Sequence, residues 1–80
     1  MSLYIAYNLK YKMIGGNFVR DPNRIMPFLG EIERVWRKVP DWRFGQFINN
    51  WLGGLERDPF YFEDNELLEE LKRFEIENLR

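Results

Sequence analysis

Glycine and proline divide this chain into short segments, and this feature limits what the chain can fold into more than any other. Proline cannot continue a helix, and adjacent glycines mark turns and element ends. Gly15-Gly16 and Gly53-Gly54 are such glycine pairs, and Pro40 separates two stretches of helical periodicity. The 80 residues therefore form one domain at most, built from short elements.

Three segments carry apolar residues at helical spacing, and they predict an all-α fold. The first helix is expected from about Pro22 to Lys38, the second from about Trp42 to Leu52, and the third from about Asn65 to Phe74 or Leu79. An aspartate precedes each as the expected N-cap, because its side chain accepts hydrogen bonds from free N–H groups. These aspartates are Asp21, Asp41 and Asp64. The prediction is a small three-helix bundle with an N-terminal arm.

Departures from this periodicity add local expectations. Pro27 lies past the first turn of the first helix, so we expect a kink or a short separate turn before it. Gly45 is expected at a point of close packing, and Asp58-Pro59 is expected to start a helical turn. The aromatics that follow, Phe60-Tyr61-Phe62, are expected to fold inwards. Most other aromatics are assigned to the core, with Trp42 as the exposed anchor of an interface.

Residues 1–19 differ in pattern from residues 20–80, so we divide the chain into an N-terminal arm and a single helical domain. Apolar and polar residues alternate along the arm, and a period of two predicts a strand. A lone strand has nothing to pair with in an otherwise helical chain. It would need a second copy of the chain, or the segment would be a helix or an extended arm instead. The alternating apolar residues are Leu3, Ile5, Tyr7, Leu9, Tyr11 and Met13.

A second interpretation is that the arm is not part of the natural protein. Met1-Ser2-Leu3 looks like an expression-vector remnant, and Met1 and Ser2 are left out of the fold argument. Gly15-Gly16 can be encoded by GGAGG, the core of a bacterial ribosome-binding site, and Val19 by the start codon GTG. One hypothesis is that residues 3–18 are translated upstream sequence and that the natural protein begins at Val19. The alternative is a genuine strand or arm, and the gene's nucleotide sequence decides between them.

Missing residue types exclude several chemistries. The sequence has no Cys and no His, so disulfides, thiolate nucleophiles, imidazole bases and thiolate or imidazole zinc sites are excluded. Apolar runs are short compared with the roughly 20 residues of a membrane span. The lack of disulfides favours the cytoplasm. Glu63, Asp64 and Glu66 resemble a cation site, but a helix start with acids that match its dipole explains them more simply. We therefore predict no enzyme activity, cofactor or metal.

Charge is unevenly distributed, although the formal net charge is −1. Residues 1–45 hold 8 Lys/Arg and 4 Asp/Glu, whereas residues 46–80 hold 4 and 9. Four cations gather around the turn between the first two expected helices, and they are the candidate nucleic-acid contacts. The near-neutral chain and the aromatic second helix argue against that interpretation, and solvated charges or head-to-tail association are the alternatives. The four cations are Arg34, Arg37, Lys38 and Arg43.

The sequence from Arg20 onwards resembles a family of small bacterial and phage proteins to which no function is assigned. The pieces that carry the resemblance fall within about positions 20–71. They are Arg20-Asp21-Pro22-Asn23-Arg24-Ile25, Glu33 to Trp36, Pro40-Asp41-Trp42-Arg43-Phe44-Gly45-Gln46, Asn49, and Asp58-Pro59-Phe60-Tyr61-Phe62-Glu63-Asp64. Pro27 and the first 19 residues are atypical of the pattern. The resemblance implies a compact helical domain and no particular activity.

Arginines and aromatics near the expected helix starts form a candidate partner surface. Internal pairing of the arginines with helix caps or carbonyls is the alternative. We predict a small non-enzymatic interaction or accessory protein, cytoplasmic, bacterial or phage-associated, and oligomeric through itself or another protein. A nucleic-acid-binding regulator that uses the four clustered cations is the second hypothesis. The candidate partner surface comprises Arg24, Trp42, Arg43, Gln46 and Tyr61.

Overall fold

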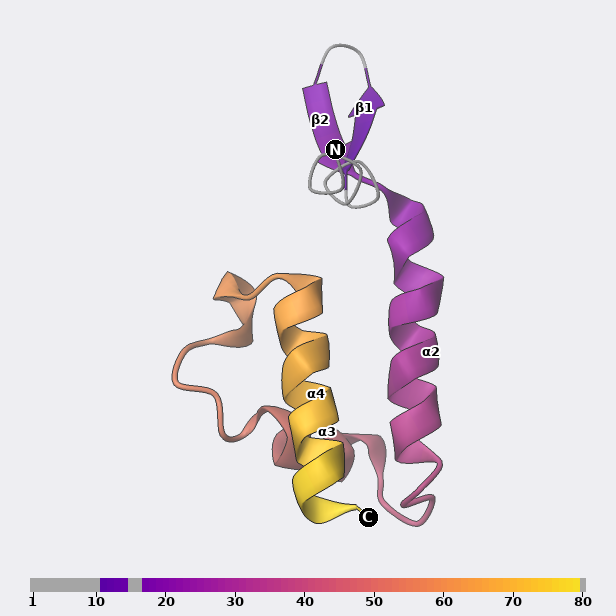
Figure 1. Cartoon of the computed structure of the whole chain (residues 1–80), viewed down its shortest axis with the longest axis vertical. Coiled ribbons are helices and arrows are strands. Elements are labelled where there is room, and N and C mark those ends of the chain that lie inside the picture. Colours follow the sequence, from indigo (N-terminus) through magenta and orange to yellow (C-terminus); the bar gives the residue numbers. More distant parts are fainter. Residues whose placement is uncertain (1–10, 15–16, 80) are drawn as a thin grey trace.

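The computed structural model describes residues 11–14 and 17–79, with side chains from Val19 onwards (Figure 1). The predicted architecture of three helices with an N-terminal arm is confirmed. Short 3-10 turns, η1 and η2, precede the first and last of the helices. The elements are β1 (Tyr11–Ile14), β2 (Asn17–Arg20), η1 (Pro22–Arg24), α2 (Ile25–Trp36), α3 (Phe44–Leu52), η2 (Pro59–Tyr61) and α4 (Asp64–Asn78).

The arm contains a two-stranded antiparallel hairpin, whose register runs from Tyr11 opposite Arg20 to Ile14 opposite Asn17. A strand was expected here without a partner in the chain, and that expectation is wrong because β2 is the partner. The sequence pattern did not reveal β2 because four residues are too few for a clear period of two. The expected strand from residue 3 to residue 10 lies outside the described residues.

Helices α2 and α4 lie side by side and run in the same direction (Figure 1). Arg24, just before α2, pairs with Asp64 at the start of α4. Further along, Arg34 of α2 pairs with Glu75 of α4. Two parallel helices cannot be joined by a short loop, because the end of the first lies far from the start of the second. After α3, residues 53–63 therefore lead the chain back to the start of α4.

The core lies where the three helices meet, and each helix supplies two buried residues to it. The pairs are spaced three or four residues apart, which places both members on one helix face. Phe47 lies at the centre, with ring centroids 5.8 Å from Trp36, 6.0 Å from Trp51 and 6.3 Å from Phe74. The buried residues are Ile32, Val35, Phe47, Trp51, Leu71 and Phe74.

Two of the three predicted N-caps are wrong. Asp21 caps as expected, but it caps η1, where its side chain accepts from Asn23 N–H at 2.9 Å. Helix α3 begins after Arg43 rather than Asp41, and α4 begins after Glu63 rather than Asp64.

Acceptors inside the first turn explain where α3 and α4 begin. Gln46 Oε1 accepts from the Arg43 N–H at 2.8 Å, and Glu66 Oε1 accepts from the Glu63 N–H at 2.7 Å. In both helices the side chain three positions into the helix satisfies the N–H of the capping residue. A capping aspartate is therefore not needed at either start.

Proline and glycine act partly as expected. Pro27 lies in the first turn of α2, and the short separate turn expected before it is η1. Gly45 is exposed, and a Cβ built there would have no atom within 4 Å, so its expected role in close packing is wrong. Gly53 ends α3 as expected. No helix in the described part of the chain combines the length and apolar character needed to cross a bilayer.

Candidate interaction surfaces

The basic corner comprises Arg34, Arg37, Lys38 and Arg43, and most of these cations lie beside carboxylates. Arg34 Nη1 is 2.8 Å from Glu75 Oε2, and Lys38 Nζ is 2.6 Å from the same oxygen. A carboxylate from α4 therefore lies between two cations of the corner, which reduces their combined attraction for an outside anion.

The other members of the basic corner differ in their contacts. Arg34 also lies 3.2 Å from Glu31 one turn earlier in α2, and Arg37 Nε lies 2.9 Å from Glu33 Oε2. Arg43 is exposed and forms no ion pair with the residues that the structure describes. The corner thus disperses into pairs rather than presenting four unpaired cations on one open face.

Glu75 has a strongly perturbed environment. Its side chain is only 12% exposed, and hydrogen bonds from Arg34 and then Lys38 lower its pKa from 4.5 to about 2. The same contact with Glu75, followed by that with Glu31, raises the pKa of the Arg34 guanidinium further above its ordinary value. These charges join α2 to α4 and are therefore used for the fold.

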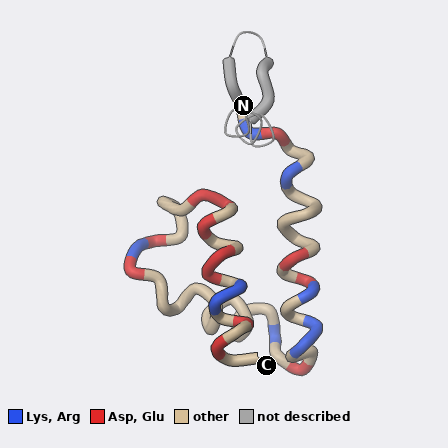
Figure 2. Tube along the Cα trace, in the orientation of Figure 1, with Lys and Arg blue, Asp and Glu red and all other residues tan. Residues whose placement is uncertain are grey.

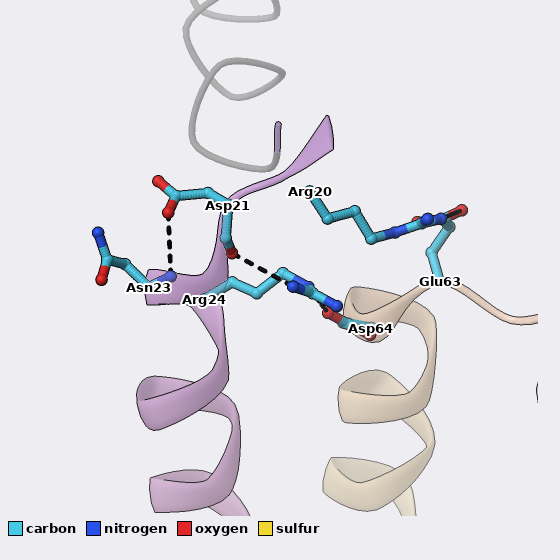
Figure 3. A network of polar contacts seen from close by, with 6 residues as sticks. All are labelled: Arg20, Asp21, Asn23, Arg24, Glu63 and Asp64. Atoms are coloured by element: carbon cyan, nitrogen blue, oxygen red, sulfur yellow. Dashed lines mark hydrogen bonds and ion pairs between the residues drawn. The ribbon is translucent and has the colours of Figure 1, made fainter. Parts of the chain in front are cut away.

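A second set of ion pairs, which we call the clasp, joins the beginnings of α2 and α4 (Figure 3). Arg24 Nε donates to Asp64 Oδ2 at 2.8 Å, and its Nη1 donates to the Asp21 carbonyl at 3.2 Å. Arg20 Nη2 lies 3.1 Å from Glu63 Oε2. Arg24, predicted as a partner contact, is therefore part of the link between η1 and α4.

Trp42 and Gln46, both predicted as partner contacts, line one surface hollow. The hollow has a volume of about 300 Å³, and Asn49 and Asn50 complete its lining. Amide side chains donate and accept hydrogen bonds without carrying charge. The hollow therefore suits neutral polar groups such as peptide amides, and its lining offers no group for acid–base chemistry. Arg43 precedes α3 and Gln46 lies in its first turn.

Trp42 is half-buried, which differs from its expected role as an exposed anchor. Its ring centroid lies 6.2 Å from that of Phe74, and its carbonyl accepts from Trp36 Nε1 at 2.9 Å. Phe44 is the exposed ring in this region, at 54% exposure and 5.4 Å from Trp36. The Trp42 ring, which was predicted to be exposed, is thus partly buried against the core.

Phe60 and Tyr61 do not fold inwards as expected. Phe60 is 83% exposed and Tyr61 is 64% exposed, whereas Phe62 is half-buried. Tyr61, a predicted partner contact, lies in η2 and is far along the chain from the residues of the hollow. The five predicted partner contacts therefore belong to three places: the clasp, the α3 region and η2.

The apolar strip of α2, defined as Ile25, Met26 and Leu29, was not predicted as a surface. These side chains are 47%, 81% and 55% exposed. Ile25 and Leu29 are one turn apart and share a side of the helix, next to Phe28, which packs on the core. The available signal was that this stretch holds more apolar residues than one buried face can accommodate.

No group of three or more carboxylates among the described residues could hold a metal ion. Two of the acids considered for such a site are used otherwise, because Asp64 pairs with Arg24 and Glu66 accepts from the Glu63 N–H. The observed contacts of these acids are those of helix starts.

Comparisons with known proteins give no further identification. No protein-family model matches the chain, and no curated protein or solved structure is significantly similar to it. The family resemblance from Arg20 onwards stays a prediction.

Proposed function

We propose that this chain is a small non-enzymatic protein-binding module. The observation that carries the proposal is the exposure of large apolar side chains on regular, hydrogen-bonded elements. The apolar strip of α2 is the main example, with Met26 81% exposed on the same helix that supplies the buried residues Ile32 and Val35 further along. Contiguous exposed apolar surface typically marks an interaction site.

A nucleic-acid-binding regulator has less support. Arg34, Arg37 and Lys38 each lie beside a carboxylate, and those carboxylates compete with phosphate for the same cations. Of the four cations of the basic corner, Arg43 alone offers an exposed guanidinium without an ion pair to the described residues. Nucleic-acid binding by surface charge depends on several such cations acting together.

Photo-crosslinking from a single position tests the protein-binding function. A photoreactive amino acid replaces Met26 in the full chain, and a matched protein carries it at Lys72, which is exposed on α4. We expect adducts with a discrete protein in a lysate of the source organism from position 26 and not from position 72. Adding Leu29→Glu to the position-26 protein should abolish the adduct, because a carboxylate placed in the strip disfavours apolar contact.

Three results would contradict the proposal. One is the absence of adducts from position 26. Another is equal labelling from positions 26 and 72, which would indicate collision rather than docking. The third is an adduct that nuclease treatment removes, because that result would favour the nucleic-acid alternative. Sedimentation velocity of the purified chain establishes whether the crosslinked protein is a second copy.

A further inference from the structure

Phe60 and Tyr61 form an exposed aromatic pair on η2. Their rings meet edge to face, with centroids 5.1 Å apart and an interplanar angle of 85°. Both rings are more than half exposed, although aromatic side chains carry the largest apolar surface available for burial. Exposed aromatics of this kind are typical anchors of protein interfaces.

The turn that carries the pair is fixed by its own hydrogen bonds. Asp58 Oδ1 accepts from the Phe60 N–H at 2.9 Å, and the Asp58 carbonyl accepts from the Tyr61 N–H at 3.0 Å. Pro59 has its φ angle fixed by its ring. The turn that carries the two aromatic rings is thus already ordered, so binding a partner does not incur the entropy cost of ordering it.

Carboxylates lie on both sides of the aromatic pair. Residues 56–66 contain five Asp/Glu and a single Lys/Arg. Figure 2 shows acidic positions in the loop before η2 and again at the start of α4. Within this stretch Glu56 is exposed, while Arg20 and Arg24 neutralise Glu63 and Asp64 in part. The local field attracts cations and disfavours an acidic partner.

A guanidinium already rests on an aromatic ring in the same segment. Arg57 Cζ lies 4.7 Å from the centroid of the Phe62 ring, within the range of a cation–π contact. Phe60 and Tyr61 offer the same chemistry to an outside cation, because their rings are open to solvent.

From these observations we propose that Phe60, Tyr61 and the surrounding carboxylates form a docking site for a Lys- and Arg-rich segment of another protein. Guanidinium or ammonium groups of that segment lie on the two rings, and neighbouring cations pair with the carboxylates. The assignment rests on the protein-binding function proposed above, and it adds the chemistry of the partner.

Fluorescence anisotropy with a short labelled peptide of alternating Arg and Gly tests this site on the full chain. A matched peptide with Gln in place of Arg is the ligand control. We expect the Arg peptide to bind at least about tenfold more tightly than the Gln peptide. The Phe60→Ala/Tyr61→Ala double variant should lose about tenfold in affinity for the Arg peptide, since it removes both rings but no charge.

Ile76→Ala is the matched protein control, because it removes a half-exposed apolar side chain from α4, and its affinity should equal that of the wild type. Equal affinity of the wild type and the double variant would overturn the proposal, since diffuse attraction to carboxylates would then explain binding. Equal affinity for the two peptides, or burial of the pair in a dimer of this chain, would also overturn it. If peptide binding fails while position 26 still crosslinks to a protein, the docking site alone is refuted; if both fail, the protein-binding function fails too.

Discussion

Glu75 is a carboxylate on which two cations from another part of the chain converge. Arg34 and Lys38 donate to it, and its pKa falls from 4.5 to about 2. Because the folded pKa is below the ordinary value, the ionised form stabilises the fold. This contribution is fully present above pH 4.5 and is lost as the pH falls through about 2. We place it at about 1 kcal/mol, because the partner cations are nearly half exposed to water.

The predicted consequence is a difference in acid sensitivity. Between about pH 6 and about pH 2, the wild type should lose about 1 kcal/mol more unfolding free energy than Glu75→Gln. Urea unfolding followed by tryptophan fluorescence measures both proteins. Glu69→Gln is the control, since Glu69 is exposed on the same helix, and it should keep the acid sensitivity of the wild type. An identical loss in Glu75→Gln would show that Glu75 does not contribute.

The two glycines of the α3 region predict opposite effects of the same substitution. A Cβ on Gly45 would meet no atom within 4 Å, whereas a Cβ on Gly53 would lie 2.5 Å from the Asn49 carbonyl oxygen. Gly45→Ala should raise the free energy of unfolding by about 0.5 kcal/mol, because alanine has fewer conformations to lose from the unfolded chain and fits the first turn of α3 without a clash. Gly53→Ala should lower it by about 1–2 kcal/mol, because the backbone must shift.

Gly54→Ala is the matched control for this pair of variants. A Cβ on Gly54 would have no atom within 4 Å, so a change within about 0.5 kcal/mol is expected. Urea denaturation of all three proteins gives the comparison. Equal destabilisation by Gly53→Ala and Gly54→Ala would show that the close approach to Asn49 is not the cause.

The clasp between η1 and α4 is expected to contribute modestly to stability. A double-mutant cycle of Arg24→Gln and Asp64→Asn should give a coupling energy of about 0.5–1 kcal/mol, because both side chains are partly exposed. Raising the salt concentration should reduce the coupling through screening. A coupling near zero would mean that the ion pair only orients the two helix starts.

The helices of this fold could be predicted, but their exact starts could not. Apolar residues at three- and four-residue spacing identified all three helices. The starts of α3 and α4 depended on Gln46 and Glu66, whose side chains satisfy the preceding N–H groups. Aspartate is generally a favourable N-cap, so Asp41 was predicted as the cap of α3. The sequence alone does not show that α3 begins instead after Arg43, with Gln46 accepting from the Arg43 N–H.

The surfaces were harder to predict because exposure depends on how helices cover one another. Helical spacing shows that Ile25 and Leu29 share a side of α2 with core residues, but not that α3 and α4 leave this stretch uncovered. Phe60 and Tyr61 were assigned inwards from their apolar character, yet the turn at Asp58-Pro59 directs them into solvent. Of the expected partner contacts, Trp42 and Gln46 do meet in one hollow.

At the scale of the whole molecule, the core of the described residues consists of six buried side chains, so losing one of them should be severe. Phe47→Ala should cost about 3–5 kcal/mol, which is comparable to the total stability of a small domain. We expect loss of near-ultraviolet circular dichroism and of a cooperative urea transition. Phe47→Leu should retain both with a smaller loss, and Phe60→Ala should remain within about 0.5 kcal/mol of the wild type. Equal effects at positions 47 and 60 would contradict the described core.

Because each helix contributes two of the buried core residues, no helix can leave without exposing the contacts of the other two. Local opening is then no easier for one helix than for another, apart from fraying at its ends. Amide hydrogens near Val35, Phe47 and Leu71 should therefore exchange with deuterium through one shared opening event. We therefore expect the three helices to open and close together as one cooperative unit, although α2 and α4 are distant in the sequence.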